Sequence, residues 1–262
     1  MNVRIKYLTS ARSFTRVSAW LLVLCLSLVS LTELSARPSC DPLKLSEEVQ
    51  KTGALSFQAR APEPDSPRAP VVIALHGLGH HKRGFSRLAD RLPKEWRVIS
   101  VDAPWRYGQG FAWYRYRCPE AEADLKSSTA RLLSLIAQLK QRYPEAPKPA
   151  IFGFSQGGVM SLSALNSAPD GWSAVASLSG YWLPASPPHS AQRAHPPLLM
   201  AHGAQDRVVS YTRGQRAAEH FGRAGYTVGW VPFEGGHTVS REAFEGLTTL
   251  LSDAFTPRNP SR

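Results

Sequence analysis

Cysteine is scarce in this sequence, with three residues in 262, and no apolar run reaches the ~20 residues of a transmembrane helix. So few cysteines exclude a disulfide-rich miniprotein. No segment repeats at a fixed period, which excludes a repeat array. Hydrophobic residues make up 43% of the chain, too many for a disordered protein. The sequence therefore predicts one globular domain with a sizeable core.

Nucleic-acid and nucleotide motifs are also missing. The formal charge of +11, from 31 Lys and Arg against 20 Asp and Glu, raises the question of an anionic partner. The basic residues are spread along the chain, apart from a short cluster at 80–83, and no stacking platform accompanies them. Neither a G-x-x-x-x-G-K-[ST] loop nor a G-x-G-x-x-G that opens a helix is present. We expect a solvated surface and no nucleic acid, with an anionic partner as the alternative.

The N-terminus has the pattern of a secretory signal. Residues 1–16 carry four basic residues and no acid, and residues 17–32 are uncharged but too short to span a membrane. Ala36 offers a cleavage point, so we expect residues 1–36 to be a cleaved signal, with an uncleaved membrane anchor as the alternative. Cleavage would remove four basic residues and Glu33, lower the charge to +8, and leave a secreted or periplasmic protein without a stable membrane span.

The two cysteines outside the predicted signal are Cys40 and Cys118. An even pair in an oxidising compartment favours a disulfide, and two free thiols are the alternative. The proline-rich segment before residue 70 is typical of a linker. We therefore divide the chain into the signal, an N-terminal extension and linker at 37–69, the main domain at 70–256 and a tail at 257–262.

From residue 70 onwards, apolar strands alternate with amphipathic helices. Short β-branched runs at 71–75 and 97–101 are typical of strands buried on both faces, and residues 121–142 place leucines at helical spacing. Further strands are expected at 150–154, 173–178, 198–201 and 227–231, and further helices at 83–92, from about 157, at 211–224 and at 241–254. This alternation predicts a mostly parallel sheet covered by helices on both faces, with ligands beyond the carboxyl ends of the strands.

A serine follows the strand at 150–154, in the segment Gly153-Phe154-Ser155-Gln156-Gly157-Gly158. A G-x-S-x-G motif between an apolar strand and a helix is the setting of a nucleophile elbow. The glycines remove side chains that would collide in so sharp a turn, and the helix start adds partial positive charge where an oxyanion would form. The pattern predicts Ser155 as a nucleophile.

A serine nucleophile needs a base, and the base needs a group that orients it. Asp206 lies in the loop after one strand, and His237 follows the next, so the order Ser, Asp, His is the one this fold uses. Glu234 is the rival orienting acid. His220 is the rival base, but it falls inside a predicted helix, where a structural histidine is the default. We expect Asp206 and His237 to serve Ser155.

The glycine-rich segment Leu75-His76-Gly77-Leu78-Gly79 follows the first of these strands. One oxyanion N–H is expected from this loop and the other from the residue after the nucleophile. The predicted donors are therefore the main-chain amides of Leu78 and Gln156, and His76 is expected to be structural.

Aromatic residues gather in the segment 105–114, which follows the second strand and includes Trp105, Phe111 and Trp113. A loop in this position should border the pocket, and its aromatic content suits an apolar acyl or aromatic group. Packing of these rings on the rim of the domain is the alternative. The chain between Ser155 and Asp206 is too short for a helical cap, which predicts an open site.

Together these segments resemble the carboxylesterase, lysophospholipase and acyl-protein thioesterase branch of the α/β-hydrolase fold. The resemblance covers about residues 70–255 and is carried by the segments 75–79, 153–158, 202–206 and 236–237. It implies an α/β-hydrolase fold without a large cap, hydrolysis of small or lipid-like esters through an acyl-enzyme on Ser155, no cofactor and no metal.

Two features depart from that family. Gly79 is followed by His80 and His81 where an acidic residue is usual, and the predicted export signal contrasts with mostly cytosolic relatives. Export keeps secreted polyester depolymerases and feruloyl or acetyl-polysaccharide esterases as alternatives. A non-catalytic binding protein of the same fold is an alternative from another class, and a dienelactone hydrolase would need Cys in place of Ser155. The sequence predicts no oligomeric state.

Overall fold

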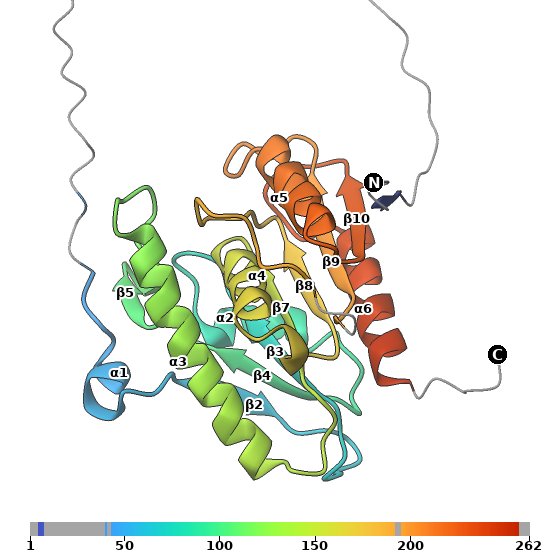
Figure 1. Cartoon of the computed structure of the whole chain (residues 1–262). Coiled ribbons are helices and arrows are strands. Elements are labelled where there is room, and N and C mark those ends of the chain that lie inside the picture. Colours follow the sequence, from blue (N-terminus) through green and yellow to red (C-terminus); the bar gives the residue numbers. More distant parts are fainter. Residues whose placement is uncertain (1–4, 8–39, 41–42, 192–194, 257–262) are drawn as a thin grey trace, which may run out of the picture.

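The computed structural model describes residues 5–7, 40, 43–191 and 195–256. Its centre is an eight-stranded sheet in the order β1-β10-β9-β8-β7-β3-β4-β2 (Figure 1). The strands are β1 (Ile5–Tyr7), β2 (Phe57–Arg60), β3 (Val71–Leu75), β4 (Arg97–Val101), β7 (Ala150–Phe154), β8 (Val175–Leu178), β9 (Leu198–Gly203) and β10 (Val228–Phe233). A separate hairpin is formed by β5 (Trp105–Tyr107) and β6 (Gly110–Ala112).

All neighbouring strands of the sheet are parallel except β2, which pairs antiparallel with β4 at the edge. The α/β-hydrolase fold expected from the sequence is confirmed. Residues of β3 alternate between two apolar cores, with Ile73 on one face of the sheet and Val72 on the other. Both side chains are fully buried, as the continuous apolar runs predicted.

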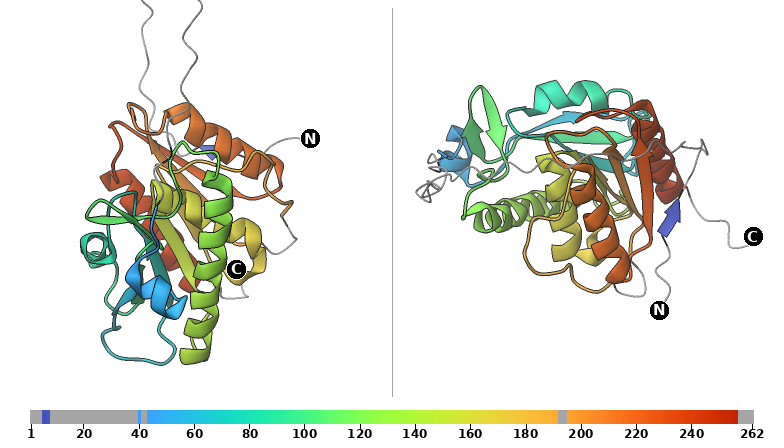
Figure 2. Two further views of the ribbon diagram at one scale, coloured as in Figure 1. Left: turned by 90° about the vertical axis from the view of Figure 1, so that its left-hand side faces the viewer. Right: turned by 90° about the horizontal axis from the view of Figure 1, so that it is seen from above.

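Helices cover each face of the sheet (Figure 2). One face carries α3 (Ala121–Arg142), α4 (Gln156–Ser167) and α5 (Tyr211–Arg223), and the other carries α2 (Lys82–Ala89) and α6 (Arg241–Phe255). The short helices are α1 (Glu47–Thr52) and η1 (Pro169–Gly171), and α1 packs its buried Val49 against the core of the first face. Between β8 and β9 the described residues form loop, so no helical cap rises over the carboxyl ends of the strands there.

Two segments hold structure that the sequence pattern did not predict. The aromatic segment at 105–114 contains the β5–β6 hairpin, because Trp105 pairs with Ala112 across a tight turn. The extension at 37–69 contains α1 and β2, and the pairing of Phe57 with Val101 places β2 within the main sheet. A four-residue edge strand with two exposed side chains has too little apolar periodicity to be recognised alone.

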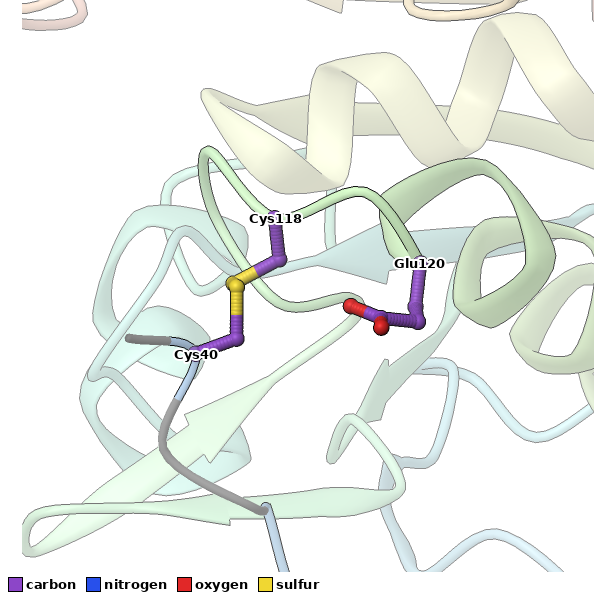
Figure 3. Close-up of side chains that lie close together, drawn as sticks. All are labelled: Cys40, Cys118 and Glu120. Atoms are coloured by element: carbon purple, nitrogen blue, oxygen red, sulfur yellow. A yellow bond between two sulfur atoms is a disulfide. The ribbon is translucent and has the colours of Figure 1, made fainter. Parts of the chain in front are cut away.

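Cys40 and Cys118 form a disulfide in the structure, with their Cα atoms 5.7 Å apart. Figure 3 shows the bond between the chain that precedes α1 and the loop that precedes α3, with the Glu120 carboxylate beside it. The bridge closes a sequence separation of 78 residues. It therefore fixes the start of the described core to the loop after Tyr116.

The predicted signal lies outside the described residues, apart from β1. The backbone of residues 5–7 pairs in parallel with β10 at the edge of the sheet. Removal of residues 1–36 would therefore leave β10 as the edge strand. None of the helices in the described ranges combines the length and the apolar character that crossing a membrane requires.

Candidate active site

Ser155 lies in the sharp turn between β7 and α4. Its backbone adopts φ 55° and ψ −118°, a conformation that residues other than glycine rarely adopt. The turn also needs close backbone contact, because a Cβ on Gly153 would lie 2.1 Å from the Gly157 carbonyl oxygen. The structure therefore has the geometry of the predicted elbow, with strain stored at the serine itself.

The three residues expected to act together lie within hydrogen-bonding distance. His237 Nε2 is 2.8 Å from Ser155 Oγ, and His237 Nδ1 is 2.7 Å from Asp206 Oδ2. The tautomer with its proton on Nδ1 satisfies both bonds, because Nδ1–H then donates to the carboxylate and Nε2 accepts from the serine hydroxyl. The His237 ring also packs against Phe154, with ring centres 4.8 Å apart.

The two rival residues lie elsewhere. The Glu234 carboxylate accepts a hydrogen bond from the Gln205 side chain at 2.5 Å. His220 is half-buried on α5, and neither residue contacts the Ser155 hydroxyl or the His237 ring. The arrangement thus joins Ser155 to His237 and Asp206.

The Asp206 carboxylate is completely buried and surrounded by N–H donors. Its Oδ1 atom accepts from the amides of Val208 and Val209, both at 2.9 Å. Its Oδ2 atom lies 2.7 Å from His237 Nδ1 and 3.3 Å from His202 Nε2. Such a ring of donors holds the carboxylate in one orientation and compensates its burial.

His202 was noticed in the sequence only as part of a family motif, yet it supports the turn that holds the acid. Its Nε2–H donates to the Val209 carbonyl at 2.8 Å, and the buried ring lies beside the first turns of α5. Burial lowers the pKa of His202, so the ring is a neutral donor at pH 7. Its position at the end of β9, four residues before Asp206, was the available signal.

The loop after β3 lies beside Ser155, as predicted for an oxyanion site. Gly77 contacts the serine so closely that an added Cβ would lie 3.3 Å from Ser155 Cβ. Neither the Leu78 amide nor the Gln156 amide donates to an acceptor within the part of the chain that the structure describes. Both residues line the cavity that contains Ser155, so these two N–H groups are available to a ligand.

His76 is structural, as its place in the sequence suggested. Its Nδ1–H donates to the Gly77 carbonyl at 2.7 Å, and its Nε2 accepts from the Ala103 amide at 3.1 Å. Burial lowers the pKa of His76 to about 4, so the ring is neutral at pH 7. A neutral ring is what the two bonds require, since a protonated Nε2 could not accept from Ala103.

A cavity of about 330 Å³ opens at Ser155. It is lined by Gly77, Leu78, His80, Tyr114, Tyr116, Phe154, Ser155, Gln156, Tyr181, Val208, Val209 and His237. Its walls are mostly aromatic and aliphatic, and Val208 at the rim is 55% exposed. The size and lining suit a small ester with an apolar group.

The three predicted substrate contacts are not among the residues that line this cavity. Trp113 is fully buried and donates from Nε1 to the His76 carbonyl at 2.9 Å. Trp105 and Phe111 belong to the hairpin, where the pairing places them on opposite faces, and Phe111 packs against the core beside the His76 ring. The expectation is therefore corrected: these rings support the loops around the site and do not form its walls.

Tyr114, next to Trp113, reaches the cavity because the elbow holds it there. The Gln156 side chain accepts from the Trp113 amide and donates to the Tyr114 carbonyl, each at 3.0 Å. Tyr116, Tyr181, Val208 and Val209 were not singled out from the sequence. Each follows a strand or the Asp206 turn, which was the signal that could have found them.

The sheet order, the elbow and the Ser155, His237 and Asp206 arrangement define a serine hydrolase of the α/β-hydrolase class. The chain belongs to the phospholipase/carboxylesterase family, which it matches over residues 58–254. It is an enzyme of the carboxylic ester hydrolase class.

Named relatives agree with this assignment. Acyl-protein thioesterase 1 of Gibberella zeae is 32% identical over 222 residues, which cover 74% of this chain and 94% of that protein. Acyl-protein thioesterase 1 of Neurospora crassa is 26% identical over 211 residues, covering 70% and 86%. The crystal structure of the Bacillus cereus carboxylesterase superposes with a TM-score of 0.69 at 18% identity, covering 80% of this chain and all of that one, a likeness of fold.

Proposed function

We propose that this protein is an exported serine esterase that hydrolyses carboxylic esters or thioesters through an acyl-enzyme on Ser155. The observation that carries the proposal is the pair of contacts at His237, 2.8 Å to Ser155 Oγ and 2.7 Å to Asp206 Oδ2. They lie at the wall of a cavity that has room for a small ester. A binding protein of this fold would have no need of a serine joined to a base and an acid.

The proposed chemistry follows from these contacts. His237 Nε2 takes the hydroxyl proton as Ser155 Oγ attacks the ester carbonyl, and the carbonyl oxygen becomes an oxyanion held by the Leu78 and Gln156 amides. The oxyanion collapses, the bond to the alcohol or thiol breaks, and His237 returns the proton to the leaving group. A water molecule then attacks the acyl-enzyme by the same steps and releases the acid and free Ser155.

Asp206 orients the base throughout. Its Oδ2 atom accepts the Nδ1–H bond that fixes the His237 ring and stabilises the imidazolium formed in each half of the reaction. Because Asp206 is itself held by the amides of Val208 and Val209, the orientation does not depend on solvent.

Export is supported by the N-terminal sequence and by the Cys40–Cys118 disulfide, since such bonds persist in oxidising compartments. Relatives named acyl-protein thioesterase make thioesters a substrate class to test beside oxygen esters. The site opens directly to solvent at Val208, which also keeps polymeric esters as candidates.

Paired variants test the assignment. Ser155→Ala, His237→Ala and Asp206→Asn should each lower kcat/KM for 4-nitrophenyl butyrate by roughly a hundredfold or more, with folding unchanged by circular dichroism. The matched controls are His220→Ala and Glu234→Gln, which remove the rival base and acid and should retain activity within about threefold. Full activity in Ser155→Ala would refute the proposal.

A further inference from the structure

Two arginines are stacked on tyrosines of the cavity wall. The guanidinium carbon of Arg213 lies 3.7 Å from the centre of the Tyr181 ring, and that of Arg117 lies 5.1 Å from the centre of the Tyr116 ring. Both tyrosines line the cavity that contains Ser155. Both arginines are exposed, so each places a positive charge beside the cavity wall and in reach of solvent.

Neither arginine is neutralised by an acid. In the described ranges Arg117 and Arg213 form no ion pair, whereas the neighbouring Arg115 is bound by Asp124 at 2.8 Å. Stacking uses the flat face of a guanidinium and leaves N–H donors at its edge for an oxygen anion. The tyrosines therefore hold the two guanidinium groups in place, and no acid of the fold neutralises their charge.

Both arginines also occupy positions that the stability of the fold does not explain. Arg213 is in the first turn of α5, where the helix dipole disfavours a cation. Arg117 has φ 58°, a left-handed conformation that is uncommon outside glycine, and the disulfide at Cys118 fixes the next residue. Neither arginine lines the cavity itself, but both unfavourable placements set a cation against a tyrosine of the same cavity wall, which points to a ligand.

The same wall offers further hydrogen-bond donors and no acid. The hydroxyls of Tyr114 and Tyr181 lie 3.0 Å apart, and because a single bond between them uses one proton, the other can be donated to a ligand. Burial raises the pKa of both tyrosines, which keeps them neutral donors. Among the described residues no acid lines the cavity, and the Asp206 carboxylate is buried within its own donors.

We propose that this wall binds an anionic oxygen group, such as a carboxylate, carried by the ester substrate. This inference rests on the proposed function and names its substrate class: small soluble esters with a negative charge near the scissile bond. An edge-on arginine and a tyrosine hydroxyl would bind the anion while Ser155 attacks the carbonyl. The charge can lie on the acyl side or on the leaving-group side, and matched esters distinguish the two.

The test compares acidic and neutral chromogenic esters with the purified protein. Mono-4-nitrophenyl adipate, with an acidic acyl group, is paired with its methyl ester. 3-Carboxy-4-nitrophenyl hexanoate, with an acidic leaving group, is paired with 4-nitrophenyl hexanoate. We expect kcat/KM about tenfold higher for at least one acidic ester than for its neutral partner, mainly through KM, and a smaller preference at high salt.

Arginine variants test whether Arg213 and Arg117 cause the preference for acidic esters. Arg213→Gln and Arg117→Gln should each lower kcat/KM for the preferred acidic ester about tenfold and leave the neutral esters within about twofold. Arg216→Gln is the matched control, because Arg216 is an exposed cation on the same helix that is not stacked on a cavity tyrosine. It should leave all four rates unchanged.

The outcomes separate this inference from the proposed function. Equal rates for acidic and neutral esters, or equal effects of Arg213→Gln and Arg216→Gln, would overturn the anionic site while the esterase remains. Loss of neutral-ester hydrolysis in Arg213→Gln and Arg117→Gln alike would also overturn it, because the arginines would then support only the fold. If the wild-type protein hydrolyses none of the four esters, the proposed function itself fails.

Discussion

The contact between His202 and Asp206 can be tested from the opposite side of the ring, at Gly214. Gly214 lies in α5, and a Cβ built there would be 2.2 Å from His202 Nδ1 and 2.8 Å from Cε1. Ordinary contact begins near 3.4 Å, so Gly214→Ala must displace the ring or the helix by about 1.2 Å. A shift of that size breaks the 2.8 Å bond from His202 to Val209 and loosens the turn that holds Asp206.

The expected result runs against helix propensity. Alanine in place of glycine within a helix normally stabilises a protein by about 1 kcal/mol. Here the clash should lower the free energy of unfolding by roughly 1–3 kcal/mol, and misplacement of the acid should lower kcat/KM by roughly 10- to 100-fold. Urea unfolding and hydrolysis of 4-nitrophenyl butyrate measure the two effects.

Gly246→Ala is the matched control. Gly246 lies in α6, and its added Cβ would meet neighbours only at 3.4 Å and beyond, so activity should be retained and stability should stay level or rise by up to about 1 kcal/mol. Adding His202→Ala to Gly214→Ala should restore part of the lost stability, because the clashing ring is then absent. Wild-type stability and activity in Gly214→Ala would refute the role assigned to His202.

Three further predictions concern the surroundings of the site. Gly110→Ala should lower kcat/KM at least tenfold, measured with 4-nitrophenyl butyrate, because its Cβ would lie 2.1 Å from the Gly79 carbonyl oxygen in the loop that carries Leu78. Cys118→Ser removes the cross-link that closes a long loop, so it should lower the free energy of unfolding by about 4 kcal/mol through the added chain entropy of the unfolded state. A loss of less than 1 kcal/mol in urea unfolding would contradict this. Burial lowers the pKa of His76 from 6.5 to about 4. As the pH falls, the unfolded chain is therefore protonated at His76 at a higher pH than the folded protein. Stability should therefore fall between pH 6.5 and 4, and urea unfolding of His76→Asn should show a shallower fall.

Much of the fold could be predicted because its central strands are buried on both faces. The strands at 71–75, 97–101 and 150–154 and the helix at 121–142 have the predicted bounds. Short β-branched runs and regular leucine spacing carry that information within the chain. The edge strand β2 and the hairpin were missed because their strands are only three or four residues long, and β2 and β5 have no buried side chain, so neither shows a clear period.

The residues of the site also divide into those that the sequence could predict and those that it could not. Ser155, Asp206 and His237 could be predicted because each follows a strand, and parallel strands bring their carboxyl ends to one edge. The residues that line the cavity could not be predicted from the sequence. Whether Trp113 or Tyr114 faces the cavity depends on the bonds that Gln156 makes to their backbone, 42 and 43 residues away along the chain. Such long-range contacts leave no local pattern in the sequence.

Covalent labelling of the protein with a fluorophosphonate probe tests most directly whether Ser155 is an activated nucleophile. Intact-mass and peptide mass spectrometry should find a single adduct, on Ser155, and labelling should slow at least a hundredfold in His237→Ala but not in His220→Ala. Absence of an adduct, or an adduct on another serine, would contradict the account.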